Sequence, residues 1–382
     1  MQTSRKSGRS HRRGRRRRSS RRIKANALAT GATAVVAVIG ATGAALTGPI
    51  GGGGPTPGEK IAAAAAINGA QPSKSSHDHS SDGKASGSDR HSPGSGDKRV
   101  LHPREVGGQR LGSSRVVVAR NAPPLPPIPA SAYVVANAKT GAVLAAKDAH
   151  GRYEPASTLK ILTAITMLPR LDPGARIAAS KLAASAVPNI IGVIPGHRYQ
   201  VADLFRALLL ISANDAAVTL VQASGSFSRG MALVNAEAHR LQAYDVVAKQ
   251  PNGLPAQGQV VSAYDLALIA RAALRMPAFM RYDQTMQAVF RGTRFGRVNM
   301  VNENGLLTGY RGALGGKTGW TMSAGATYVG MARRHGVTLI VSFLHAKPLT
   351  TITSAERLLD WGFAASGKVR QVGTLVRPLS NR

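Results

Sequence analysis

The chain has 382 residues, of which 43% are hydrophobic, and it carries a formal net charge of +32 with no cysteine. This hydrophobic content supports one good-sized core plus tails, and the lack of cysteine excludes disulfides, thiol catalysis and cysteine-ligated metals. The histidines either lie in a low-complexity stretch or form no ligand-spaced pair. We therefore expect no metal and no other cofactor.

The positive charge is concentrated near the N-terminus, where residues 1–24 hold a run of Arg and Lys with no acid. Such a run could bind nucleic acid or an anionic surface. However, residues 25–48 are uncharged and include an apolar stretch long enough to span a bilayer. A positive flank before an apolar segment is typical of a signal peptide or a signal anchor. We expect membrane contact through this segment and no nucleic-acid partner; both cleavage and retention of the segment remain open.

Residues 49–125 are rich in Gly, Ser, His, Asp and Pro, with four consecutive glycines at 51–54 and a proline-rich stretch at 123–127. This composition favours an extended, unpacked linker. Apolar runs on either side of Lys139-Thr140-Gly141 then predict a β-hairpin over residues 132–147. The linker would hold the following domain at a distance from the membrane.

The motif Ser157-Thr158-Leu159-Lys160 precedes a run with helix-like apolar spacing, which places Ser157 near a helix N-terminus. Residues three apart share a helix face, so Ser157 and Lys160 should project into the same cleft. A serine hydroxyl is a poor nucleophile and needs a base within hydrogen-bond reach. The lysine amine supplies such a base.

Two further motifs follow in chain order. Ser212-Ala213-Asn214 ends a strongly apolar helical segment at 201–211, where a connection between helices can direct side chains into a cleft. Lys317-Thr318-Gly319 follows two glycines and continues in strand-favouring residues, which predicts a strand edge offering Lys, Thr and backbone N–H groups to a ligand. Taken singly, Thr318 could be an ordinary strand residue and Ser212 a helix cap. Together the three motifs are a signature of serine enzymes that react with penicillin.

The sequence resembles the D-alanyl-D-alanine carboxypeptidases, the low-molecular-weight penicillin-binding proteins of the serine-peptidase type. The resemblance covers residues 126–366 and, besides the three motifs, includes the segments 132–135, 153–160, 251–255, 263–267, 302–304 and 315–325. It implies an α/β fold of the β-lactamase and transpeptidase kind, in which an antiparallel sheet packs against helices and faces a helical lobe across the active-site cleft. We expect the last strands at 326–333 and 337–344, a closing helix at 353–363, and a short tail at 367–382.

The resemblance also implies a covalent reaction on peptidoglycan stem peptides, outside the cytoplasm. Ser157 would attack the carbonyl of the penultimate D-Ala while Lys160, as an unprotonated amine, takes the hydroxyl proton. Ser212 would relay a proton to the leaving amine, and Asn214 would hold the substrate amide. β-Lactam antibiotics would act as covalent inhibitors.

The third motif would bind the rest of the substrate. Lys317 and Thr318 would bind the terminal carboxylate beside Gly319, and the backbone N–H groups of Ser157 and Trp320 would form the oxyanion hole. Lys317 would also disfavour protonation of Lys160, which keeps that amine a base near neutral pH.

Three alternatives remain open. A class A β-lactamase needs a carboxylate to activate the deacylating water, normally in E-x-x-L-N between the second and third motifs, and neither Glu237 nor Glu303 begins that pattern. An endopeptidase acting on cross-links would use the same machinery. The domain could also be a catalytically silent wall-binding module. The segment 182–195 lacks the acidic, glycine-rich character expected there, which leaves substrate preference open.

Overall fold

The computed structural model describes residues 106–380. The predicted basic segment 1–24, the apolar segment 25–48 and residues 49–105 of the predicted linker lie outside the described residues. Among residues 106–380, none of the helices combines the length and the apolar character needed to cross a membrane.

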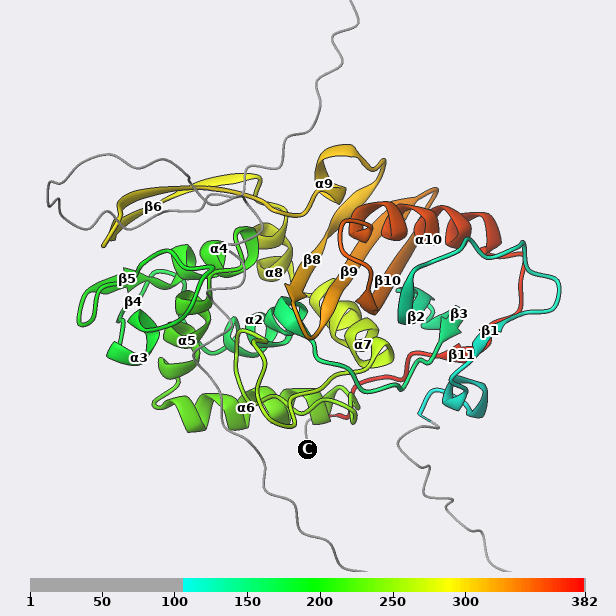
Figure 1. The fold of residues 1–382 in the computed structure, drawn as a ribbon, viewed down its shortest axis with the longest axis horizontal. Coiled ribbons are helices and arrows are strands. Elements are labelled where there is room, and N and C mark those ends of the chain that lie inside the picture. The colour runs from blue at the N-terminus through cyan, green and yellow to red at the C-terminus, as the bar shows by residue number, and fades with distance from the viewer. Residues whose placement is uncertain (1–105, 381–382) are drawn as a thin grey trace, which may run out of the picture. The chain divides into compact units, whose positions relative to one another are not determined.

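A seven-stranded sheet organises the described residues, with the order β1-β3-β2-β10-β9-β8 and β11 paired to β3 (Figure 1). Every pairing in it is antiparallel. Its strands are β1 (Val116–Val118), β2 (Ala130–Asn137), β3 (Ala142–Lys147), β8 (Ala313–Thr321), β9 (Gly325–Arg334), β10 (Val337–Ala346) and β11 (Gly373–Thr374). The predicted hairpin at 132–147 is confirmed, and Lys139-Thr140-Gly141 lies at its turn.

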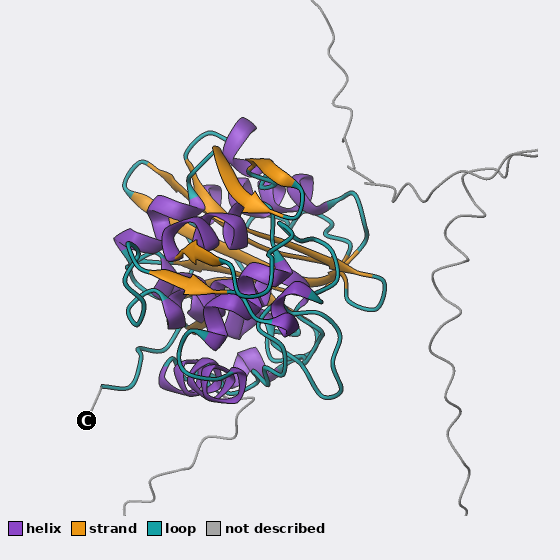
Figure 2. Ribbon diagram, turned by 90° about the vertical axis from the view of Figure 1, so that its left-hand side faces the viewer, coloured by secondary structure: helices purple, strands orange, loops and turns teal. Residues whose placement is uncertain are grey.

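Helices cover both faces of this sheet, as Figure 2 shows. In β2, Val134 packs into the core cluster that contains α7 (Ala263–Ala273) and α2 (Lys160–Met167), while Tyr133 and Val135 pack into the cluster that contains α10 (Thr351–Ala365). Alternate residues of a strand point to opposite faces, so a strand buried on both sides is apolar at nearly every position. This explains the continuous apolar runs in β2, β9 and β10.

A helical lobe lies beside the sheet, and its last helix contacts β8 (Figure 1). It contains α3 (Lys181–Ala184), α4 (Val201–Leu210), α5 (Asn214–Gln222), α6 (Phe227–Arg240) and α8 (Pro277–Asp283), together with the strand pairs β4 (Arg176–Ala178) with β5 (Arg198–Gln200) and β6 (Gln287–Thr293) with β7 (Gly296–Val301). Short helical turns complete the chain: η2 (Gln109–Gly112), η3 (Ala156–Leu159) and α9 (Leu306–Gly309). The predicted architecture of an antiparallel sheet facing a helical lobe is therefore confirmed.

The packed part of the chain is longer at both ends than residues 126–366. Residues 106–125 belong to the predicted linker, yet Leu111 is buried in the main core and β1 pairs with β3. At the other end, β11 pairs with β3 and Leu375 is buried, within what the sequence suggested was a tail. These segments are too short to show periodicity, and their burial comes from pairing with a strand that is distant in sequence.

Candidate active site

The turn η3 and the start of α2 place the first motif. Ser157 lies in the 3-10 turn and Lys160 is the first residue of α2, with the Lys160 Nζ atom 2.9 Å from the Ser157 Oγ atom. Every residue of α2 is buried, so the helix is fixed in the core between the sheet and the lobe. The i, i+3 spacing therefore brings the predicted nucleophile and the predicted base into contact.

Two carbonyl oxygens hold the Lys160 amine in place. Its Nζ atom donates to Asn214 Oδ1 at 2.7 Å and to the backbone oxygen of Asn252 at 2.8 Å. Asn252 can approach so closely because Gly253, with φ +80°, has no Cβ: one built there would lie 1.7 Å from the backbone oxygen of Ala156. A neutral amine has two N–H donors and one lone pair. With both donors bound to carbonyl oxygens, the lone pair faces the Ser157 hydroxyl.

The environment of Lys160 favours this neutral form. The side chain has no solvent exposure, and burial lowers its pKa well below the usual lysine value, with the nearby Lys317 cation lowering it further. The sequence suggested only the second cation as the cause. Burial is the larger one.

The second motif joins α4 to α5. Ser212 is buried with a positive φ of 60°, and its Oγ atom has no hydrogen-bond partner among the described residues. Asn214 begins α5; besides accepting from Lys160, it donates through Nδ2 to the backbone oxygen of Val187 at 2.9 Å. The Asp215 carboxylate accepts from three successive backbone N–H groups at 191–193. The motif is thus tied to the segment 182–195, whose role the sequence left open.

The third motif lies on β8, the edge strand of the sheet. An edge strand leaves alternate backbone N–H and C=O groups free for a ligand. Lys317 is only 2% exposed, and its Nζ atom donates to the Thr318 backbone oxygen at 2.9 Å and lies 3.4 Å from Thr318 Oγ1. Burial lowers the pKa of Lys317, while the carboxylates of Glu303 and Asp283 raise it.

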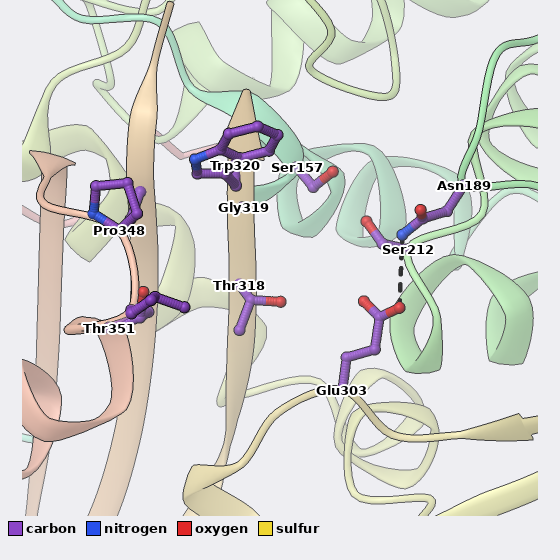
Figure 3. A pocket seen from close by; sticks show the side chains of 11 residues that line it. Ser157, Asn189, Ser212, Glu303, Thr318, Gly319, Trp320, Pro348 and Thr351 are labelled. Carbon is purple, nitrogen blue, oxygen red and sulfur yellow. Dashed lines mark hydrogen bonds between the residues drawn. The ribbon is translucent and has the colours of Figure 1, made fainter. Parts of the chain in front are cut away.

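A cavity of ≈ 550 Å³ brings the three motifs to a common surface (Figure 3). Its lining includes Ser157, Ser212 and three residues of β8, Thr318, Gly319 and Trp320. Behind this lining, the buried side chains of Lys160, Asn214 and Lys317 support it. Five of the eight residues that the sequence predicts for the site therefore line one cavity, and the other three are buried next to lining residues of the same motifs.

The sequence reasoning assigned no role to several residues of this site. Glu303 and Asn189 line the cavity and approach each other at 3.5 Å, as the dashed line in Figure 3 marks. Asn252 contributes a backbone oxygen, which no side-chain pattern can reveal. The segments around Asn252 and Glu303 belong to the resemblance described above, and this was the one signal that could have indicated both.

The comparisons with known proteins agree with this geometry. The sequence profile of the D-alanyl-D-alanine carboxypeptidase family matches residues 118–348. The D-alanyl-D-alanine carboxypeptidase DacB2 of Mycobacterium tuberculosis is 37% identical over 258 residues, which cover 66% of this chain and 88% of the relative.

Solved structures give the same result. A crystal structure of a D-alanyl-D-alanine carboxypeptidase from Mycobacterium tuberculosis matches with a TM-score of 0.64 at 36% identity, covering 68% of this chain and 99% of that one. The crystal structure of a Streptomyces DD-transpeptidase matches with a TM-score of 0.60 at 27% identity, covering 63% of this chain and 100% of that one. The fold and the site define a serine enzyme of the penicillin-binding class. The chain belongs to the D-alanyl-D-alanine carboxypeptidase family, whose members are serine peptidases that react through an acyl-enzyme.

Proposed function

We propose that this protein removes the terminal D-Ala from peptidoglycan stem pentapeptides through an acyl-enzyme on Ser157. The observation that carries the proposal is the 2.9 Å approach of Lys160 Nζ to Ser157 Oγ, with the other two contacts of the amine made to carbonyl oxygens. This arrangement orients the lone pair of a neutral lysine toward the hydroxyl proton.

In the acylation step, Ser157 Oγ forms a bond to the carbonyl carbon of the penultimate D-Ala, and its proton passes to Lys160. The backbone N–H groups of Ser157 and Trp320 receive the negative oxygen of the tetrahedral intermediate. The C–N bond then breaks as Ser212 delivers its hydroxyl proton to the leaving amine and takes up the proton held by Lys160, so that both side chains end neutral. The unpartnered Oγ atom of Ser212 supports this relay role, because it is free to bind the amine.

Two groups bind the substrate on either side of the scissile bond. Lys317 and Thr318 receive the terminal carboxylate on β8, and Asn214 holds the substrate amide from α5. After D-Ala leaves, water hydrolyses the ester on Ser157, and the proton released returns through Lys160. The free edge of β8 lets the peptide pair with Gly319 and Trp320 as an added strand.

The family acts on the cell wall, and we place this protein outside the cytoplasm on that basis. In this proposal the segment 25–48 directs the chain across the membrane or anchors it there, with residues 1–24 remaining inside. β-Lactams would acylate Ser157 in the same way as the substrate.

One observation favours a second candidate function, β-lactam hydrolysis. The Glu303 carboxylate lines the same cavity as Ser157 and Ser212, and β-lactam deacylation by class A enzymes uses a glutamate. Glu303 does not stand in the E-x-x-L-N pattern. We therefore place it second.

Incubation of the full chain with a fluorescent penicillin, followed by intact-mass measurement, separates these possibilities. The proposal predicts a stable one-to-one adduct that is absent from Ser157→Ala, and release of D-Ala from a pentapeptide. Rapid hydrolysis of the drug without an adduct would instead identify a β-lactamase. Neither adduct nor hydrolysis, with wall sedimentation retained by Ser157→Ala, would identify a non-catalytic binding module. Cleavage of cross-linked dimers in preference to pentapeptides would identify an endopeptidase.

A further inference from the structure

A buried carboxylate lies behind the strand that carries Lys317. Asp283 is the last residue of α8 and is 1% exposed, and its Oδ2 atom accepts a hydrogen bond from the Gly316 backbone N–H at 2.8 Å. The neighbouring Gln284 donates through Nε2 to the Leu314 backbone oxygen at 2.8 Å. The end of α8 therefore holds β8 at two points immediately before Lys317, and Figure 1 shows the two elements side by side.

Glycine at position 315 leaves space for the Asp283 carboxylate. Gly315 has φ +142°, and a Cβ built on it would lie 1.9 Å from Asp283 Oδ2. No side chain larger than hydrogen fits at position 315 while Asp283 contacts β8. The first glycine of the Gly-Gly-Lys-Thr-Gly sequence is thus explained by the approach of Asp283.

Asp283 violates two local rules of stability. A carboxylate at the last residue of a helix faces the negative end of the helix dipole. Its Oδ1 atom is also buried without a hydrogen-bond partner among residues 106–380. The same holds for the Nδ2 atom of Asn304, whose Oδ1 atom accepts from the Tyr328 hydroxyl at 2.7 Å. Residues that break local rules in this way are concentrated at functional sites.

The charged groups around Asp283 point to what it does. Lys317 on β8 is the cation that lowers the pKa of Asp283, and the Asp283 charge contributes to the raised pKa of Tyr328 on β9. Arg206 on α4 lies over the ring of Tyr282 and pairs with Asp203, so it is engaged elsewhere. Burial raises the pKa of Asp283 to about 7, although the Gly316 hydrogen bond and Lys317 oppose this rise.

We propose that Asp283 is a positioning residue for the reaction: it fixes β8 through the Gly316 N–H and keeps Lys317 in the charged form that receives a substrate carboxylate. The inference rests on the proposed function of Lys317. Glu303, on the cavity side, also raises the pKa of Lys317, and by more than Asp283 does. Asp283 differs from Glu303 because it is buried and bound to β8, where salt and solvent screen a charge less.

The test compares Asp283→Asn and Asp283→Ala with the wild-type full chain. The asparagine keeps an acceptor for Gly316 but removes the charge, whereas the alanine removes both. We expect the alkaline limb of kcat/KM for D-Ala release to move down by about one pH unit in both variants, because an opposite charge nearby is lost. In Asp283→Asn the change should be in KM. In Asp283→Ala kcat should fall as well, because β8 is no longer held by the carboxylate.

Thermal unfolding at pH 8 separates this role from a structural one. Replacing an incompletely paired buried carboxylate by a neutral amide should leave the melting temperature of Asp283→Asn equal to or above that of the wild type. Asp265→Asn, at another buried carboxylate with a raised pKa, is the matched control and should leave the alkaline limb in place. A lower melting temperature with an unmoved limb in Asp283→Asn would overturn the inference. Absence of D-Ala release by the wild type would instead overturn the proposed function.

Discussion

Lys160 and Lys317 are two buried lysines that lie behind the lining of one cavity, and their surroundings differ. Lys160 contacts a hydroxyl and two neutral carbonyl oxygens. Lys317 is also buried, and burial lowers the pKa of both amines. Carboxylates oppose this at both sites, Glu303 and Asp215 at Lys160 and Glu303 and Asp283 at Lys317, but the Lys317 cation lowers the pKa of Lys160 further. We propose that lysine serves as a base in α2 and as a cation in β8 because the surroundings of the two amines differ.

Removing the Lys160 amine should have the largest effect. We expect Lys160→Met to reduce the rate of Ser157 acylation by a fluorescent penicillin about 10²- to 10⁴-fold, which is the usual contribution of general-base catalysis. Adduct formation measures acylation, and circular dichroism checks that the variant is folded. Lys139→Met, in the exposed Lys-Thr-Gly of the hairpin turn, is the matched control and should acylate normally. Equal loss in both variants would contradict the assignment.

Removing the Lys317 cation should have a smaller effect, and this effect should be on substrate binding. A charge-assisted hydrogen bond contributes ~1.5–3 kcal/mol, so Lys317→Met should raise KM for a peptide ending in D-Ala-D-Ala about 10- to 100-fold. The same peptide with a C-terminal amide lacks the carboxylate, and its hydrolysis should change much less. If the acid and the amide lost activity equally, Lys317 would not be the carboxylate group.

Close packing between β8 and the nucleophile gives a third prediction. A Cβ at Gly319 would lie 2.4 Å from Thr327 Oγ1 and 2.8 Å from the Ser157 backbone N atom. Gly319→Ala should therefore destabilise the fold by about 1–3 kcal/mol and slow acylation by displacing Ser157. Gly309→Ala is the control, since a Cβ there meets nothing within 4 Å. Unchanged acylation and stability in Gly319→Ala would show that the cavity wall adapts.

The smallest expected effect is on the pH dependence of the free energy of unfolding. The folded-state pKa of Lys160 is lowered, so the unfolded chain binds more protons than the folded chain between the two values. The contribution of this group to the free energy of unfolding should then rise with pH across that interval and be lost in acid. Denaturant titrations of the wild type and Lys160→Met across this range should show a weaker pH dependence in the variant; identical dependence would contradict the lowered pKa.

Much of the fold could be predicted because local patterns coincide with it. The apolar runs on both sides of residues 139–141 and those of β9 and β10 correctly predicted strands, since these strands are buried on both faces. β1 and β11 could not be predicted, because a strand of three residues or fewer carries no period and is defined by its partner.

Part of the site could likewise be predicted from the sequence, and part of it could not. The motifs around Ser157, Asn214 and Lys317 predicted groups that the structure brings to one cavity. Asp283 and the backbone oxygen of Asn252 could not be predicted, because only the tertiary fold brings α8 and the 251–255 segment to those motifs. Glu303 stands beside two asparagines in the sequence, and nothing local shows that it faces the cavity.

The pH profile of Ser157 acylation by penicillin reports the charge of both lysines in one measurement. We predict an acid limb from a group that titrates well below the usual lysine range and is lost in Lys160→Met, together with an alkaline limb that is lost in Lys317→Met. A rate that rises only where free lysines lose their proton would contradict this prediction, since Lys160 would then be an ammonium at neutral pH.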